Sequence, residues 1–164
     1  MYVPRRVVLV LVAAGALVFA LGASGSSRHD GNGNGEKLIR SGLAPSVPAD
    51  PAFHGIAAAG AAWVLSDSSV RLEANGKLDI RIDGLILPSL GTAGPVTTVS
   101  ASLLCGADVQ TGPTVTTGTF PLSQAGNARI EAKLNLPATC LAPIFVIHPN
   151  GGTTRYIAVS GWKP

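Results

Sequence analysis

Three carboxylates lie in the stretch Val70–Leu87, whose sequence is VRLEANGKLDIRIDGLIL: Glu73, Asp79 and Asp83. Paired carboxylates act as general acid and general base where they converge in a cleft. Here Glu73 and Asp79 alternate with apolar residues, and Asp83-Gly84 follows as a bend. We therefore predict that these acids belong to a solvated charged face and that none of them is catalytic.

The three histidines, His29, His54 and His148, are dispersed along the chain without His-x-His or His-x3-His spacing, so the sequence predicts no metal site. His148 precedes the loop Pro149-Asn150-Gly151-Gly152 and is the domain histidine that could lie beside a nucleophile. The chain has no Gly-x-Ser-x-Gly elbow. We predict no catalytic residue; the alternative is an extracellular hydrolase that uses His148 with an unplaced Ser or Asp.

No cofactor is expected, because GNGNG at 31–35 fits neither the Gly-x-Gly-x-x-Gly nor the Walker spacing. A sugar-stacking platform needs exposed rings on one face, whereas most of the aromatic residues stand in apolar runs that are typical of a core. These aromatic residues are Trp63, Phe120, Phe145, Tyr156 and Trp162, of which Trp162 is the candidate for a surface contact.

The two cysteines, Cys105 and Cys140, are predicted to form a disulfide, since the chain reads as an exported protein. Its first residues, MYVPRRVVLVLVAAGALVFALGASGSS, place Arg5 and Arg6 before an apolar run. We predict a signal peptide over residues 1–22, cleaved after Gly22. The alternative is an uncleaved signal anchor, because the run approaches the roughly 17–25 residues that span a bilayer.

The formal net charge of +3 falls to +1 when Arg5 and Arg6 are removed with the signal. The sequence then shows no Lys/Arg cluster, so we expect neither nucleic acid nor an anionic lipid surface as a partner. We expect a membrane as a partner only if the N-terminal segment is uncleaved. The expected partner is a protein or glycan at the cell envelope, and the expected location is secreted or on the extracellular face of the envelope.

Residues 23–54 are rich in Gly, Ser, Asn and Pro and are predicted to form a flexible linker. Residues 55–164 contain repeated strand patterns separated by Gly/Pro turns, and no window of comparable length has helical periodicity. We predict an all-β domain, an antiparallel Ig-like/Greek-key β-sandwich of seven or eight strands with one disulfide. The predicted strands are residues 61–65, 70–74, 77–82, 98–105, 114–122, 128–136, 142–148 and 155–162. APIFVIH at 142–148 is apolar on both faces, which predicts a central strand.

The length of the turn in Val70–Leu87 can be predicted from the side chains that each possible turn places opposite one another. A two-residue Asn75-Gly76 turn places leucines opposite acids, whereas a three-residue loop over 74–76 pairs Leu72 with Leu78 and Arg71 with Asp79. The second register gives one apolar face and, on the other face, the ion pairs Glu73–Lys77 and Arg71–Asp79. We predict the three-residue loop, with Gly76 as a left-handed bulge. A similar pattern of glycine, alternating strand and Leu-x-Leu closure recurs from Gly126 to Pro137.

The order of these motifs resembles uncharacterised secreted proteins of actinobacteria and is more remotely similar to the CHRD β-domain. The residues concerned are Gly76–Leu85, the Phe-Pro-Leu at 120–122 and the Tyr-Ile-Ala-Val at 156–159. The CHRD pattern carries an Ala-His-Ile-His type segment in mid-domain, but here Val99–Cys105 contains no histidine, so no metal role is carried over. The resemblance implies a β-domain outside the cytoplasm. The leading hypothesis is an exported, non-catalytic binding or structural module; a second alternative is the same domain displayed on a membrane anchor.

Overall fold

The computed structural model describes residues 35–106 and 112–161, all within the compact unit Gly33–Pro164. The predicted signal or anchor, the linker before residue 35, His29 and Trp162 lie outside the described residues. Within the described part of the chain no helix is long and apolar enough to cross a membrane. The described residues form strands, turns and bends, which confirms the all-β class.

The chain forms strands that together build one long, curled sheet and one short strand pair. The order in the long sheet is β6-β5-β9-β11-β1-β3-β4-β8, with β7 also paired to β5, and β2 and β10 form the separate parallel pair. All other pairings are antiparallel, as predicted. The strands are β1 (Lys37–Pro45), β2 (Ala57–Ala58), β3 (Asp67–Glu73), β4 (Lys77–Asp83), β5 (Thr98–Leu104), β6 (Val115–Thr116), β7 (Phe120–Pro121), β8 (Ala128–Lys133), β9 (Ile144–Pro149), β10 (Arg155–Tyr156) and β11 (Ala158–Gly161).

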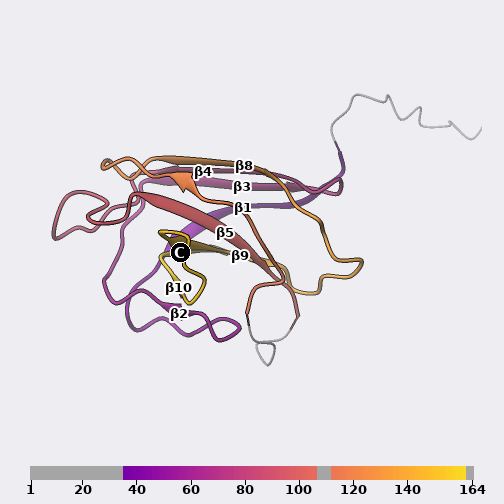
Figure 1. Ribbon diagram of the computed structural model, residues 1–164, viewed down its shortest axis with the longest axis horizontal. Coiled ribbons are helices and arrows are strands. Elements are labelled where there is room, and N and C mark those ends of the chain that lie inside the picture. Colours follow the sequence, from indigo (N-terminus) through magenta and orange to yellow (C-terminus); the bar gives the residue numbers. More distant parts are fainter. Residues whose placement is uncertain (1–34, 107–111, 162–164) are drawn as a thin grey trace, which may run out of the picture. The chain divides into compact units, whose positions relative to one another are not determined.

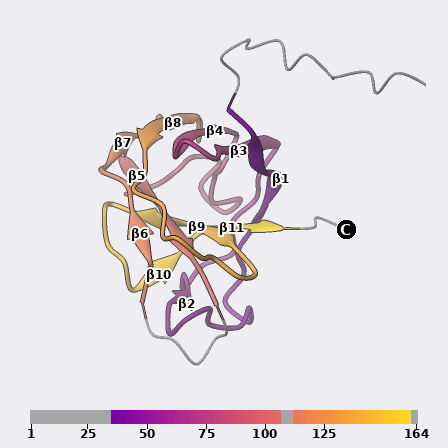
Figure 2. The ribbon, with the colours of Figure 1, turned by 90° about the vertical axis from the view of Figure 1, so that its right-hand side faces the viewer.

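The long sheet folds into two layers because β1 belongs to both of them (Figures 1 and 2). Its first half pairs with β3, from Lys37↔Glu73 to Ser41↔Val70, and its second half pairs with β11, from Gly42↔Gly161 to Pro45↔Ala158. A bulge at Leu38 shifts the register near the start of the strand. Bulges and bends are the usual way in which a strand passes from one layer to the other.

The main core lies between the two layers and follows from the alternation of apolar side chains. Val70, Leu72, Leu78, Ile80 and Ile82 are all buried, which is the apolar face that the three-residue loop predicts. A smaller cluster on the other side of β5 and β9 contains Ile56, Ala58, Leu104, Val146 and Tyr156. Apolar packing on both faces makes β9 a central strand between β5 and β11, as predicted.

The register of the β3–β4 hairpin is confirmed. Leu72 lies opposite Leu78, and Arg71 lies opposite Asp79. Gly76 has φ of +85°, and its amide donates a hydrogen bond to the carbonyl oxygen of Glu73 (2.8 Å). The pairing of opposite side chains therefore predicted the three-residue loop correctly, although Asn-Gly is typical of two-residue turns.

The predicted linker over residues 23–54 is wrong from Lys37 onward, because that segment supplies β1 and part of the second layer's edge. Leu43 is buried, and the amide of Ser46 donates to the carbonyl oxygen of Ile157 (2.9 Å). The hydroxyl of Tyr156 donates to the carbonyl oxygen of Pro51 (2.8 Å), and burial raises the pKa of Tyr156 to about 12. The low content of apolar residues did not predict β1, a strand that is held by backbone hydrogen bonds to neighbours on both sides.

Other strand boundaries also differ from the prediction. Residues 61–65 are not a strand but make one isolated bridge, Val64↔Ile86. The predicted strand over 114–122 consists of two short pieces, β6 and β7, and the one over 155–162 is divided between β10 and β11. β6 and β7 both pair with β5, at different positions along it. In the second case the chain changes partner, because β10 pairs with β2 whereas β11 pairs with β9.

Candidate functional site

The acids of the opening stretch lie on the outer face of β3 and β4 and do not converge in a cleft. Asp79 accepts a hydrogen bond from Arg129 of β8 (2.9 Å), and Asp83 accepts one from Arg81 (2.7 Å). The predicted pair Arg71–Asp79 is wrong as an ion pair, since the diagonal neighbour Arg129 takes that carboxylate. The predicted pair Glu73–Lys77 is likewise replaced: Glu73 accepts from the side-chain amide of Asn75 (3.1 Å).

His148 does lie beside a serine. A carbonyl oxygen only accepts, so Nδ1 carries the hydrogen and donates to the carbonyl oxygen of Arg155 (2.7 Å). The other ring nitrogen, Nε2, then accepts from the Ser102 hydroxyl (2.8 Å). Ser102 Oγ accepts in turn from the hydroxyl of Thr116 (2.7 Å). The result is a directed chain of hydrogen bonds from β6 through β5 to β9 and β10.

This chain is arranged like a nucleophile and its base, but its surroundings differ from those of a catalytic triad. The third position is a backbone carbonyl where a triad has a carboxylate. Ser102 and His148 are both 0% exposed, and burial lowers the pKa of His148. His54 is buried elsewhere, with φ of +51°. In the described residues no group of three or more His, Cys, Asp or Glu side chains could hold a metal ion.

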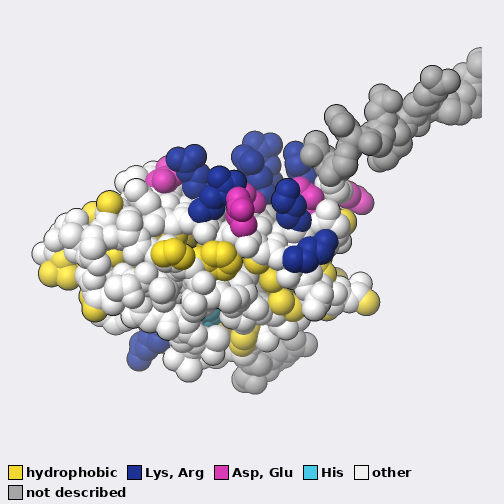
Figure 3. Space-filling model, turned by 45° about the horizontal axis from the view of Figure 1, so that its top comes forward, with side chains coloured by type: hydrophobic (Ala, Val, Ile, Leu, Met, Phe, Trp, Pro, Cys, Tyr) yellow, Lys and Arg dark blue, Asp and Glu magenta, His cyan; other side chains and the backbone are white. Residues whose placement is uncertain are grey.

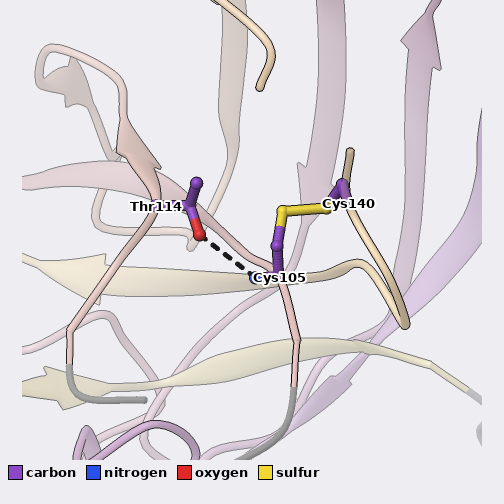
Figure 4. Close-up of a disulfide and its surroundings, with 3 residues drawn as sticks. All are labelled: Cys105, Thr114 and Cys140. Atoms are coloured by element: carbon purple, nitrogen blue, oxygen red, sulfur yellow. Dashed lines mark hydrogen bonds between the residues drawn. A yellow bond between two sulfur atoms is a disulfide. The ribbon is translucent and has the colours of Figure 1, made fainter. Parts of the chain in front are cut away.

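The predicted disulfide between Cys105 and Cys140 is confirmed, with the two Cα atoms 4.9 Å apart (Figure 4). It ties the connection between β8 and β9 to the end of β5. Two hydrogen bonds reinforce this end: the Cys105 amide donates to Thr114 Oγ1 (3.2 Å), and the Gly106 amide donates to the carbonyl oxygen of Leu141 (2.7 Å). The disulfide indicates an oxidising compartment.

An apolar pocket of about 310 Å³ opens next to this disulfide, and we call it the end pocket. Its walls include Leu38 and Ile39 of β1, Leu72 of β3, Leu103 of β5, and Leu136 and Cys140 of the β8–β9 connection. These segments meet at the end of the domain where β1 begins and where the β3–β4 hairpin turns (Figure 1). Leu38 remains 52% exposed at the bulge. The end pocket is thus a gap between the two layers that no side chain of the described residues fills.

The outer face of the β1-β3-β4-β8 layer gathers most of the charged side chains (Figure 3). Its register opposes like charges in several places: Arg40↔Arg71, Lys77↔Lys133, Arg81↔Arg129, Asp79↔Glu131 and Asp67↔Asp83. Directly opposed like charges destabilise a sheet. Ion pairs therefore run along the strands or diagonally, as in Arg81–Asp83, Arg129–Glu131 and Arg129–Asp79.

Sequence reasoning missed both the end pocket and this concentration of basic residues. The lining of the pocket comes from four separate parts of the chain, and the basic residues alternate along strands that are far apart in the sequence. The alternation of charge in KLDIRID and ARIEAK was a usable signal once those strands were paired with each other. Comparisons of the chain with protein-family models, with curated proteins and with solved structures found no match.

Proposed function

We propose that this chain is an exported, non-catalytic β-sandwich module that binds a single apolar chain in its end pocket. The observation that carries the proposal is the pocket itself, about 310 Å³ and lined by apolar side chains from both layers. Ligand pockets usually measure roughly 300–1,000 Å³. A pocket near the lower end of that range is suited to one chain and not to a bulky ligand.

The lining favours a hydrocarbon ligand over the glycan or protein considered from the sequence. Sugar binding relies on exposed aromatic rings. Among the described aromatic residues, Trp63, Phe145 and Tyr156 are buried, and none of them lines the end pocket. An apolar chain would instead remove the exposed side chain of Leu38 and its neighbours from water, at roughly 25 cal/mol per Å² of buried apolar surface.

A non-catalytic role is supported by the burial of Ser102 and His148, which leaves a substrate no access to either side chain. The hydrolase alternative rests on the hydrogen bond between them, and it requires β5 and β6 to separate during turnover. It is tested with chromogenic short-chain esters. Hydrolysis by the exported protein that is abolished in Ser102→Ala would replace the non-catalytic proposal.

Export is supported by the disulfide together with the charged-then-apolar start of the sequence. Cleavage after Gly22 and retention as an anchor are both compatible with the binding proposal. Mass spectrometry of the exported protein distinguishes them, because an N-terminus at Met1 requires the anchored form.

The binding proposal is tested by titrating the exported protein with a neutral medium-chain monoacylglycerol in a calorimeter. Ala138 is exposed and lines the end pocket, so Ala138→Trp should fill the pocket and abolish the binding signal. Ala125 is also exposed and lies in a turn that contributes nothing to the pocket lining, which makes Ala125→Trp the matched control. Absence of binding, or equal binding by both variants, would overturn the proposal.

A further inference from the structure

We infer that the occupant of the end pocket is the acyl chain of an anionic single-chain phospholipid, and that its phosphate binds a group of basic residues at the rim. This inference rests on the proposed function and adds the class of ligand. The basic residues, called here the rim cluster, are Lys37, Arg40, Arg71, Lys77 and Lys133.

Part of the rim cluster borders the pocket, because β1 and β3 contribute residues to both. Lys37 and Arg40 flank the pocket residues Leu38 and Ile39 on β1. Arg71 immediately precedes the pocket residue Leu72 on β3. Lys77 and Lys133 are directly opposed at the same end of β4 and β8, next to the hairpin loop. On β1 and β3, then, apolar side chains line the pocket and the adjacent basic side chains are exposed, whereas β4 and β8 contribute only exposed basic side chains at this end.

The cations of the rim cluster have no ion-pair partner among the described residues, whereas those at the other end of the layer do. The ion pairs between described residues all involve Arg81 or Arg129. Asp79 and Glu131, the nearest acids on β4 and β8, both bind Arg129. Two further carboxylates, Glu36 and Glu73, lie at this end, so five cations outnumber two acids there.

The register places Lys37 opposite Glu73 and Arg71 opposite Asp79, but it also opposes like charges within the rim cluster. Arg40 is directly opposite Arg71, and Lys77 is directly opposite Lys133. Like charges opposed across strands destabilise the sheet. A phosphate bound by the rim cluster would reduce the repulsion within each of these two pairs. Arg and Lys side chains are the usual donors to phosphate oxygens.

A membrane is the source of ligand that this inference names. The apolar run Val7–Ala23 precedes β1 by the thirteen residues 24–36, and β1 begins at the pocket. Thirteen residues span at most about 45 Å when fully extended, so an uncleaved N-terminal segment could not separate β1 from the membrane by more than that distance.

The test compares lysophosphatidylglycerol with lysophosphatidylcholine of the same acyl chain, both below their critical micelle concentrations, by calorimetry on the exported protein. At low salt we expect the anionic lipid to bind roughly fivefold more tightly, because the choline cation of the other lipid is repelled by the rim cluster. Lys77→Gln combined with Lys133→Gln should remove most of that preference. Arg81→Gln, which removes a charge at the other end of β4 and keeps Arg129 bound to Asp79 and Glu131, should leave the preference intact.

The outcomes separate the two proposals. Equal affinity for the two lipids, with both abolished by Ala138→Trp, would overturn the inference that the rim cluster selects an anionic headgroup and would keep the apolar-chain function. Binding of neither lipid nor the monoacylglycerol would overturn both. Preference for the anionic lipid that persists in Ala138→Trp would mean that the rim cluster acts without the pocket, and this too would contradict the inference. A dimer in light scattering that dissociates on lipid addition would identify a second copy as the resident occupant and overturn it.

Discussion

The backbone amide of Leu134 donates a hydrogen bond of 2.8 Å to the carbonyl oxygen of Gly76, which fixes the tip of the β3–β4 hairpin to the chain leaving β8. A matching bond joins the amide of Leu85 to the carbonyl oxygen of Gly126 (2.9 Å) at the other end of the β4–β8 pair. The two segments of similar sequence, which contain Gly76 and Gly126, thus lie antiparallel. The glycine at the start of each segment accepts a hydrogen bond from the leucine that follows the strand of the other segment.

Gly76→Ala should strongly destabilise the protein. The new Cβ would overlap the carbonyl oxygen of Leu134, and φ of +85° is unfavourable for any residue with a Cβ. We expect a loss of about 2–4 kcal/mol in the free energy of unfolding, measured by urea denaturation. Gly91 also has a positive φ (+67°), but nothing lies within 4 Å of its added Cβ. Gly91→Ala should therefore cost only about 1 kcal/mol, and equal losses in the two variants would contradict the packing argument.

Removal of the disulfide by Cys105→Ala with Cys140→Ala should reduce stability and also open the end pocket. The bridge closes a loop with a sequence separation of 35, which corresponds to roughly 3–4 kcal/mol in the chain-entropy model. Because Cys140 lines the pocket and its connection forms one wall, monoacylglycerol binding should weaken even where the variant is fully folded. Unchanged affinity under folding conditions would show that the wall holds its position without the bridge.

Stability should decrease on acidification in a way that depends on His148. Burial lowers the pKa of its imidazole in the folded protein, so the unfolded chain binds more protons as the pH falls below about 6.5. The contribution is complete above that pH and is lost progressively as the pH falls toward the folded-state pKa. Urea midpoints measured from about pH 8 to about pH 5 should fall more steeply for the natural protein than for His148→Gln. Parallel profiles would exclude His148 as the source.

Lys133→Glu should stabilise the fold while it weakens lipid binding. It replaces the like-charge pair with Lys77 by an opposite-charge pair, worth about 0.2–1 kcal/mol at low salt. The gain should disappear in high salt, because both side chains are exposed. Lys133→Gln removes the repulsion without adding an attraction, so its melting temperature should lie between those of Lys133→Glu and the natural protein. A destabilised Lys133→Glu variant would mean that the opposed lysines do not repel each other appreciably.

The sequence predicted those features that depend on local opposition of side chains. The hairpin register follows from Leu72 and Leu78, and the central position of β9 follows from its apolar residues on both faces. The strand β1 could not be predicted in this way, because the bulge at Leu38 breaks its alternation and Leu43 is its one buried hydrophobic residue. Its stability comes from backbone hydrogen bonds to two partners that are distant in the chain.

The candidate site was less predictable than the fold for the same reason. His148 was singled out, but its partner Ser102 stands 46 positions away and was one hydroxyl among many. The end pocket combines residues from β1, β3, β5 and the β8–β9 connection, so no local pattern contains it. The rim cluster emerged only when register placed Arg40 opposite Arg71 and Lys77 opposite Lys133.

The sharing of β1 between the two layers also has a consequence for the order of folding. Its second half pairs with β11, so Gly42 near the start of the domain meets Gly161 near its end. Contacts between residues this distant form late, because a large loop must close before they can stabilise anything. A chain emerging N-terminus first from a ribosome or a translocation channel therefore cannot complete its sheet until the last strand is released. The domain's architecture therefore delays the completion of its sheet until β11 is available to β1.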